Sequence, residues 1–273
     1  MRGVLRRLLA GELTEAEAEV ELRRVQLEEL AGRARLDLGR RHRRGLPEVV
    51  LASGKRPEEA ARLTVALARE QGQGLVSRLG ADHWPALQRQ ASEAGLEVVR
   101  YHAAARVCRP GFVPETRPGR VAMLTAGTSD LPAADEARMI VEACGLEARV
   151  EADLGVAGLH RLLGPLAELL AWRPDVLVVA AGMDGVLPGV VAALVDLPVI
   201  GLPVGVGYGV GGRGEAALLT MLQSCSTGLV VVNVDNGVGA GAAAVLIAAR
   251  AGAAGSRRSR PARAKRGSAG PAR

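Results

Sequence analysis

The sequence predicts an α/β protein: a three-layer domain with a parallel sheet flanked by helices, preceded by a smaller α/β N-terminal domain. From about Arg120 to Arg250, apolar runs of strand length alternate with helical patterns, and Gly or Pro turns separate them. The runs are almost continuously apolar, which is typical of strands buried on both faces of a parallel sheet. Aromatic residues make up 2% of the 273 residues, so Ala, Val and Leu must build the core.

The first 35 residues are predicted to be a helical accessory segment. Thr14 and Glu17 have the spacing of a capping box, in which each side chain accepts a hydrogen bond from the backbone N–H of the other residue. Leu22, Val25 and Leu30 continue an apolar pattern of helical period. We therefore expect one amphipathic helix from Thr14 to about Leu30.

Residues 36–118 are predicted to form the small α/β domain and a linker. A basic stretch precedes Glu48–Leu51, which has the composition of a short strand. Pro57 and the two glutamates after it predict the start of a helix, because proline and acidic side chains are favoured in the first turn. Proline and glycine punctuate residues 109–119, and we place the start of the larger domain, residues 119–250, there.

The larger domain is predicted to consist of regular βα units. The expected strands are Val121–Ala126, Ala148–Ala152, Val176–Ala181, Pro198–Leu202 and Leu229–Val234. The expected helices are Ala133–Cys144, Ala157–Trp172, Pro188–Leu194, Glu215–Gln223 and Ala240–Arg250. In such sheets ligands bind at the carboxyl ends of the strands, so the residues that follow each strand are the candidates for chemistry.

The basic charge of the chain lies in its C-terminal segment. The formal net charge is +6, and residues 251–273 contribute +7 without any acidic residue, so the rest of the chain is nearly neutral. This segment is rich in Ser, Gly, Pro, Ala and Arg and has no apolar anchor. We expect a disordered, solvated tail, and a nucleic-acid-binding arm is the less favoured alternative.

Cysteine usage and hydropathy predict a cytoplasmic protein. The three cysteines are widely and irregularly spaced, which fits a reducing compartment and gives neither a disulfide framework nor a CxxC metal motif. Met1–Ala10 is rich in arginine without a following apolar region, so no signal peptide is expected. The longest apolar stretches are of strand length or interrupted, so no membrane span is expected either.

Small and hydroxyl-bearing residues follow the first strand of the larger domain. They are Gly127, Thr128, Ser129 and Asp130, and they lead into a helix. Backbone N–H groups at a helix N-terminus favour a phosphate, and Asp130 could accept a hydrogen bond from a ribose hydroxyl. The alternative is that Ser129 or Asp130 only caps the helix.

Two further loops at strand ends carry candidates. Gly182 and Asp184 follow the third strand, and Asp184 could act as a base or metal ligand, or simply stabilise the turn. Residues 203–214, after the fourth strand, are so rich in glycine that the backbone could approach a ligand closely or move as a lid. This segment contains Gly207 and Tyr208, whose ring could stack on a planar ligand or pack on the surface.

Cys225 and His160 are the remaining candidates for chemistry. Cys225 follows a predicted helix just before the final strand, where a buried, inert cysteine is the ordinary outcome. His160 lies inside a helical pattern, where a solvent-facing histidine would be unremarkable. Neither residue is assigned a role by its local pattern alone.

Taken together, these segments resemble two related families. Residues 126–130 and 181–201 resemble the signatures of PurE-type aminoimidazole ribonucleotide carboxylases. Those enzymes carry a Ser-Ala-His-Arg-Thr-Pro element where this chain has residues 153–163, so a purine enzyme is disfavoured. That replacement, with residues 206–209, 221–225 and 232–237, is similar to the LarB family of nickel-pincer cofactor biosynthesis, and residues 36–55 resemble that family's leader domain.

The resemblance implies an activity and its residues. It implies carboxylation of the pyridinium ring of nicotinic acid adenine dinucleotide by carbon dioxide or bicarbonate, with hydrolysis of the phosphoanhydride to release AMP. It makes Cys225 the nucleophile, and Asp184 or His160 the group that moves the ring proton. Nucleotide binding falls to Gly127, Thr128, Ser129, Asp130, Gly182, Gly207 and Tyr208. Mg²⁺ and a homo-oligomer are expected, and a tightly bound organic cofactor is not.

Two departures from the family pattern concern the site. Asp184 stands where the family has glutamate, which shortens a possible base by one methylene. Val204 and Gly205 stand where it has Thr-Ser, which removes hydroxyl groups from the ligand loop. Two other functions remain open: an aminoimidazole ribonucleotide carboxylase or mutase, which needs no cysteine, and a non-catalytic nucleotide- or RNA-binding module that uses the basic tail.

Overall fold

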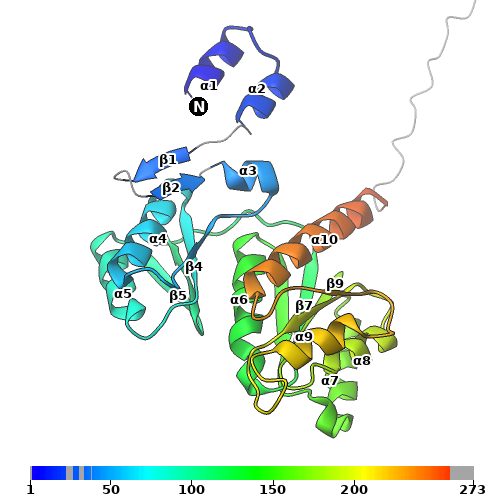
Figure 1. Cartoon of the computed structure of the whole chain (residues 1–273). Helices are drawn as coiled ribbons and strands as arrows, with labels where there is room; N and C mark the ends of the chain where they lie inside the picture. The colour runs from blue at the N-terminus through cyan, green and yellow to red at the C-terminus, as the bar shows by residue number, and fades with distance from the viewer. Residues whose placement is uncertain (1, 23–26, 31–33, 38, 259–273) are drawn as a thin grey trace, which may run out of the picture.

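The structure, a computed structural model, describes residues 2–22, 27–30, 34–37 and 39–258, and it confirms the predicted α/β class (Figure 1). A five-stranded parallel sheet lies in the C-terminal half, in the order β11-β10-β9-β7-β8. A four-stranded mixed sheet, β3-β4-β6-β5, lies in the N-terminal half. Residues 109–119 connect the two without helix or strand.

The parallel sheet has helices on both faces, as predicted for a three-layer domain. Its strands are β7 (Arg120–Thr125), β8 (Glu147–Glu151), β9 (Val176–Ala181), β10 (Val199–Pro203) and β11 (Leu229–Val231). Its helices are α6 (Leu131–Ala143), α7 (His160–Ala171), α8 (Leu187–Leu194), α9 (Glu215–Leu222) and α10 (Gly237–Arg258). The short 3₁₀ helices η1 (Thr128–Asp130) and η2 (Val156–Gly158) follow β7 and β8.

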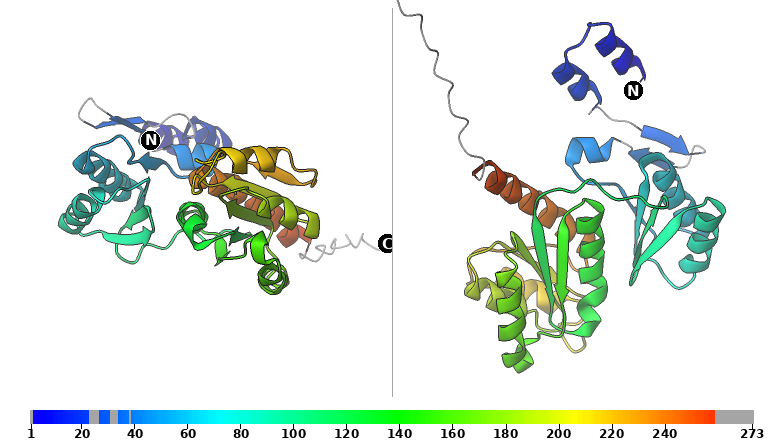
Figure 2. Two further views of the ribbon diagram at one scale, coloured as in Figure 1. Left: turned by 60° about the horizontal axis from the view of Figure 1, so that its bottom comes forward. Right: turned by 180° about the vertical axis from the view of Figure 1, so that it is seen from behind.

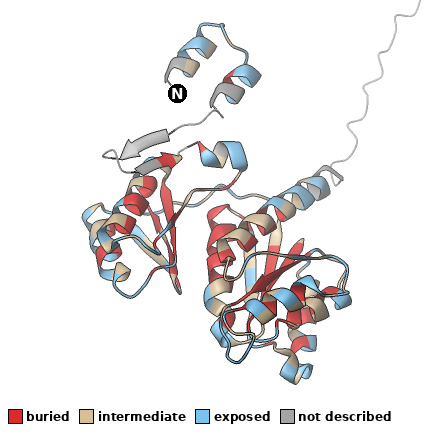
Figure 3. Cartoon of the chain, viewed as in Figure 1, coloured by how far each residue is buried: buried red, intermediate tan, exposed pale blue. Residues whose placement is uncertain are grey.

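Alternating side chains of each strand supply two separate cores. Val121 and Met123 of β7 pack in one cluster with α6 and α10, whereas Ala122 and Leu124 pack in another with α7, α8 and α9. This alternation is the strand period of two applied to a sheet that is covered on both sides. Figure 3 shows the buried strands between the two helix layers.

The four-stranded sheet belongs to the smaller domain and shares α6 with the larger one. Its strands are β3 (Val49–Leu51), β4 (Gln73–Ser77), β5 (Glu97–Tyr101) and β6 (Ala104–Cys108), with helices α4 (Pro57–Gln71) and α5 (His83–Glu93) on one face. Leu75, Tyr101 and Ala104 of this sheet pack in the same cluster as α6. The two sheets therefore lie on either side of one helix, as the views of Figure 2 also show.

The N-terminal segment is only partly helical. The capping box is confirmed: Thr14 N donates to Glu17 Oε2 at 2.8 Å, and Glu17 N donates to Thr14 Oγ1 at 3.3 Å. The helix that it starts, α2 (Glu15–Leu22), follows α1 (Arg2–Leu9). The predicted continuation to Leu30 is wrong, because β1 (Leu27–Leu30) pairs antiparallel with β2 (Ala34–Asp37), and α3 (Arg40–Arg44) follows. A two-turn helix has little stability of its own, so strand pairing can replace its extension.

The final helix is longer than predicted at both ends. It begins at Gly237 and ends at Arg258, so the disorder expected from residue 251 is wrong for residues 251–258, and residues 259–273 lie outside the described part. A Cβ on Gly252 would lie 2.8 Å from the Pro118 backbone, so the helix packs closely on the linker there. Gly237–Ala254 has the length and composition of a membrane span. Its buried residues Ala240, Ala244 and Ala248 pack in the core of the larger domain, as in a core helix.

Candidate active site at the carboxyl edge of the parallel sheet

A cleft of about 640 Å³ opens at the carboxyl ends of the parallel strands. The chain leaves β7 toward β8 on one side, and β9 pairs with β7 on the other. The loops after β7 and β9 therefore diverge at this point, which is where ligands bind in open parallel sheets. Ligand pockets commonly measure about 300–1,000 Å³, so the cleft is large enough for a nucleotide.

Four loops line the cleft. The lining residues are Ala126, Gly127, Ser129 and Asp130 after β7, Gly155, Val156, Ala157 and Arg161 after β8, Ala181 at the end of β9 with Gly182, Met183, Asp184 and Leu187 after it, and Val206, Gly207 and Tyr208 after β10. Six of the predicted nucleotide-binding residues are among them, and Thr128 is not. From the segment after β8 only His160 was predicted to take part, and the residues that line the cleft there are Gly155, Val156, Ala157 and Arg161 instead.

Asp130 braces two of these loops. Its side chain is buried, with Oδ2 accepting a hydrogen bond from Gly127 N at 2.8 Å and Oδ1 accepting one from Gly182 N at 3.1 Å. Burial raises the pKa of this carboxyl, and the two backbone N–H groups act in the opposite direction. The predicted cap on α6 is not formed, since Asp130 makes no side-chain cap hydrogen bond to that helix. Its Oδ2 instead binds Gly127 N before η1, and its Oδ1 ties the β7 loop to the β9 loop across the point where they diverge.

The loop after β9 approaches the glycine-rich segment at backbone distance. Met183 N donates to Val206 O at 3.1 Å, and a Cβ on Gly182 would lie 2.3 Å from the same oxygen. Only glycine fits at position 182 without moving the opposite wall. Met183 itself has a φ of 51°, which is unusual for a residue with a side chain.

The charged side chains of the cleft are Asp130, Asp184 and Arg161. Asp184 is exposed, and its Oδ1 accepts a hydrogen bond from Val186 N at 3.4 Å, so it both stabilises the turn and faces solvent in the cleft. Arg161 Nη1 donates to Asp153 Oδ2 at 2.8 Å and is the cation among the lining residues. Arg161 was not among the predicted site residues, although it adjoins His160.

His160 is not brought into the cleft. It is the first residue of α7 and is exposed, but it does not line the cleft, whereas Arg161 does. Consecutive residues on a helix point about 100° apart, so the two side chains cannot share one direction. Tyr208 lines the cleft with 82% of its surface exposed, which leaves its ring free to stack on a ligand.

Cys225 lies outside the cleft of its own chain. It is the exposed thiol of the three, since Cys108 and Cys144 are buried. It follows α9 on the connection that enters β11 at its amino end, and it does not line the cleft. The nucleophile that the resemblance implies therefore does not reach the cleft of its own chain, because α9 carries the chain back from the ligand edge before Cys225 is reached.

A second hollow, of about 520 Å³, lies between α4 and α5. Its lining includes Arg62, Arg69 and Arg89 together with Glu70 and Glu93, so charges of both signs face each other there. No loop from the end of a parallel strand reaches it. The cleft of the larger domain is therefore the better candidate for an active site.

Comparison with known proteins agrees with this geometry. Residues 120–266 match the model of the AIR carboxylase family, and residues 27–110 match that of the LarB/PurE-like N-terminal domain. An uncharacterized protein of Methanocaldococcus jannaschii is 36% identical over 252 residues, which cover 91% of this chain and 96% of that protein. The chain therefore belongs to the LarB family and carries a PurE-like AIR carboxylase domain.

Proposed function

We propose that this chain carboxylates nicotinic acid adenine dinucleotide at ring position 5 and hydrolyses its phosphoanhydride, giving pyridinium-3,5-biscarboxylic acid mononucleotide and AMP. A carboxylase-type activity follows from the family. The observation that supports the dinucleotide is the nucleotide-sized cleft of a LarB-family chain, combined with an exposed thiol on the same domain. We place the reaction in the cytoplasm, as the free cysteines favour.

The chemistry requires a nucleophile that can leave again. A pyridinium ring is electron-poor and does not attack carbon dioxide. If the Cys225 thiolate adds at position 4, the ring becomes a neutral dienamine whose position 5 can form a bond to the carbon of carbon dioxide. A base then takes the proton from position 5, and the electron pair of the carbon–sulfur bond leaves with the thiolate, which restores the aromatic ring.

Asp184 is our candidate for the group that takes this proton. It is the exposed carboxylate among the lining residues, whereas both oxygens of Asp130 already accept backbone hydrogen bonds. A general base must come within hydrogen-bond reach of its proton, which the cleft allows for Asp184. His160, the other candidate from the sequence, lies outside the cleft lining and is the weaker choice.

The nucleotide would be held by backbone and side-chain groups of the cleft. The N–H groups of η1 lie at the start of α6, where a phosphate is favoured, and Arg161 offers a second contact to an anion. The exposed ring of Tyr208 can stack on the pyridinium or the adenine. These groups act by position and charge, so no tightly bound organic cofactor is needed.

Mg²⁺ fits this site only through the substrate. In the part of the chain that the structure describes, no group of three or more His, Cys, Asp and Glu side chains could hold a metal ion. Mg²⁺ keeps several water ligands and commonly binds substrate phosphates, so the diphosphate would hold the ion in the cleft and leave Asp184 free to act as the base. Bound there, the ion would screen the charge of the two phosphates.

Cys225 would act on the cleft of a second copy. Exposed apolar side chains accompany it in sequence, namely Leu219 and Leu222 of α9 and Val230 of β11, with exposed fractions of 55%, 60% and 54%. An exposed apolar surface of this kind favours association. We therefore infer a homo-oligomer in which this face of one copy supplies the thiol to the cleft of a neighbour.

The proposal is tested by mass analysis of the products. Wild-type chain is incubated with nicotinic acid adenine dinucleotide, bicarbonate and Mg²⁺, and the carboxylated mononucleotide and AMP are expected. Cys225→Ser should abolish ring carboxylation, because an alkoxide is far less accessible than a thiolate near neutral pH. Cys108→Ser and Cys144→Ser are the controls. Near-normal carboxylation by Cys225→Ser, or turnover of aminoimidazole ribonucleotide instead, would contradict the proposal.

The contribution of a second copy is tested by complementation. Cys225→Ser and Asp184→Ala are each expected to be inactive alone. If the thiol reaches a neighbouring cleft, mixed oligomers of the two variants regain part of the activity, because some clefts combine an intact Asp184 with an intact Cys225 from another chain. Mixtures that stay inactive after co-expression would show that both residues serve the same chain.

A further inference from the structure

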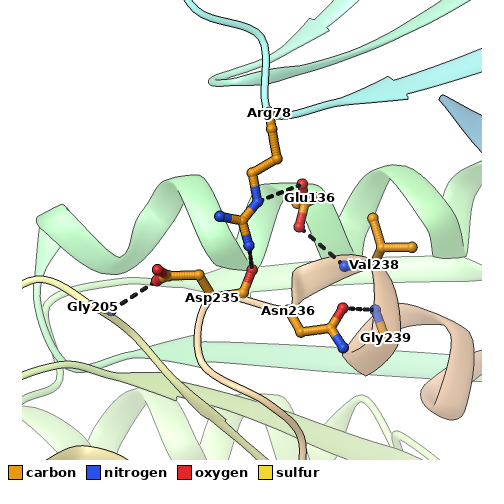
Figure 4. Close-up of polar contacts among 7 residues, drawn as sticks. All are labelled: Arg78, Glu136, Gly205, Asp235, Asn236, Val238 and Gly239. Carbon is orange, nitrogen blue, oxygen red and sulfur yellow. Dashed lines mark hydrogen bonds and ion pairs between the residues drawn. The ribbon is translucent and has the colours of Figure 1, made fainter. Parts of the chain in front are cut away.

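The smaller domain reaches the site region of the larger domain through Arg78. This residue directly follows β4 and has a φ of 58°, a conformation that costs energy for a residue with a side chain. Its Nη2 donates a hydrogen bond to the carbonyl oxygen of Asp235, and its Nε lies 3.9 Å from Glu136 Oε1 (Figure 4). One guanidinium thus contacts two elements of the larger domain, the turn after β11 and α6.

Asp235 in turn forms hydrogen bonds with the glycine-rich segment. Its N donates to Pro203 O at 2.8 Å, and its Oδ1 accepts a hydrogen bond from Gly205 N at 2.7 Å. The two residues touch closely, since a Cβ on Gly205 would lie 2.8 Å from Asp235 Oδ2. The next residue, Val206, begins the cleft wall and accepts the hydrogen bond from Met183 N. Only Asp235 and Gly205 separate Arg78 from a lining residue.

Glu136 explains why a cation is needed at this point. Its side chain is buried, with a relative exposure of 6%, and its Oε2 accepts a hydrogen bond from Val238 N at 3.1 Å at the start of α10. Burial and the nearby Asp235 charge raise the pKa of Glu136, and Arg78 lowers it. Without the guanidinium, only backbone N–H groups would oppose the effect of burial on the pKa of Glu136, and a protonated Glu136 would lose acceptor strength toward α10.

We propose that Arg78 is a positioning residue through which the smaller domain holds the Gly205–Tyr208 wall of the cleft in place. The proposal rests on the proposed function in taking this cleft as the substrate site. The smaller domain would then contribute to substrate binding, although none of its described residues lines the cleft. The strained backbone at Arg78 and at Asp235, whose φ is 55°, is maintained by these contacts.

Hydrogen exchange of the unliganded chain tests the positioning directly. In Arg78→Ala, the amides of residues 204–208 should exchange about 10-fold faster than in the wild type, since a hydrogen bond from a charged donor is lost. His102→Asn is the matched control, because His102 also crosses between the domains, with Nδ1 at 2.5 Å from Asp135 Oδ2, but does not touch Asp235. Arg78→Lys keeps the positive charge but replaces the guanidinium with a single ammonium group. The amide exchange rates of this variant should therefore fall between those of the wild type and those of Arg78→Ala.

Kinetics give the second readout. Arg78→Ala should raise KM for nicotinic acid adenine dinucleotide about 10-fold with a smaller change in kcat, because it loosens a binding wall and not the reacting groups. Asp235→Gly tolerates the left-handed backbone and removes the carboxylate, so it should give the same pattern if Arg78→Ala fails to fold. Unchanged exchange at residues 204–208 in Arg78→Ala, or an equal acceleration in His102→Asn, would overturn the proposal. The exchange comparison needs no substrate, so it tests the positioning role of Arg78 even if the wild type does not act on the dinucleotide.

Discussion

Asp130 shows how one residue can determine the shape of the cleft. Both of its oxygens accept backbone hydrogen bonds, from Gly127 N and Gly182 N, and only a carboxylate offers two acceptor atoms. In Asp130→Asn the amide nitrogen must face one of these donors. We expect the free energy of unfolding to fall by about 1–3 kcal/mol, the cost of a buried donor without an acceptor. Asp184→Asn, at an exposed position, should change it by less than about 0.5 kcal/mol; denaturant titration of both variants measures the difference.

The pH dependence of the same residue has a defined sign. Burial raises the pKa of Asp130 above the ordinary value of 3.8, so in the folded chain this carboxyl holds its proton at pH values where the unfolded chain has lost it. Its contribution to stability is therefore complete below pH 3.8 and is lost as the pH rises through the folded-state pKa. Unfolding titrations of the wild type and Asp130→Asn between pH 4 and 7 should show the advantage of the wild type shrinking as the pH rises. An advantage that grows with pH would show that the amide hydrogen bonds outweigh burial.

The three cysteines should differ in reactivity. Burial raises the pKa of Cys144 to about 11 and also raises the pKa of Cys108, whereas Cys225 is exposed. Only the thiolate reacts with alkylating agents, so iodoacetamide at pH 8 should modify Cys225 alone in the folded chain and all three in denaturant. Peptide mass analysis reads the sites. Modification of Cys144 before unfolding would mean that α6 opens from the core more readily than its burial indicates.

At the scale of single elements, replacing glycine with alanine should have a large effect on substrate binding in a loop of the cleft and little effect in a helix. A Cβ on Gly182 would lie 2.3 Å from Val206 O, so Gly182→Ala must push the glycine-rich segment away and should lower dinucleotide affinity at least 10-fold. Gly164 lies inside α7 with no atom outside its own helix within 4 Å of its Cβ position. Gly164→Ala should leave binding unchanged and change stability by less than about 0.5 kcal/mol, because the higher helix propensity of alanine is offset by the contact of its Cβ with the ring of Pro165. Calorimetric titration and thermal unfolding of the two variants test this contrast.

The length of α10 gives a second prediction at the element scale. Gly252 packs against the linker, with its Cβ position 2.8 Å from Pro118 and 2.9 Å from Gly119 N. Removing residues 251–273 deletes this contact, and we expect a loss of about 1 kcal/mol, or about 2–4 °C in Tm. Removing residues 259–273 deletes a sequence without apolar anchors and should leave Tm unchanged. Equal melting temperatures for the two truncations would show that the last turns of α10 do not stabilise the fold.

The sequence predicts the parallel sheet well because its central strands β9 and β10 are apolar throughout. The expected strand Val176–Ala181 has the same bounds as β9. The prediction Leu229–Val234 was too long, since the chain leaves the sheet after Val231 and turns at Asp235 into α10.

Three kinds of information were missing from local patterns. Strand pairing replaced the helix expected up to Leu30, the return of α9 placed Cys225 away from the cleft, and Arg78 approaches Asp235 across 157 positions of sequence.

At the scale of the whole molecule, the shared helix α6 predicts that both domains unfold together. Leu75, Tyr101 and Ala104 of the smaller domain pack in the same core cluster as α6, and Tyr101 Oη donates to Glu142 Oε2 at 2.6 Å. Separating the domains would expose one face of α6 to water. The free energy of this burial is lost by both domains at once, which makes a half-unfolded chain unfavourable.

The two tryptophans allow a direct test of this cooperativity. Trp84 lies on α5 in the smaller domain, and Trp172 follows α7 in the larger one. Fluorescence of Trp84→Phe reports the larger domain, and that of Trp172→Phe reports the smaller one, so their denaturant midpoints should coincide. Leu75→Ala, at the shared face, should lower stability by about 2–5 kcal/mol and move both probes equally. Leu67→Ala, in the core of the smaller domain alone, is the control: under full cooperativity it too shifts both midpoints. A smaller domain that melts first in either variant would show that α6 joins the two domains only weakly.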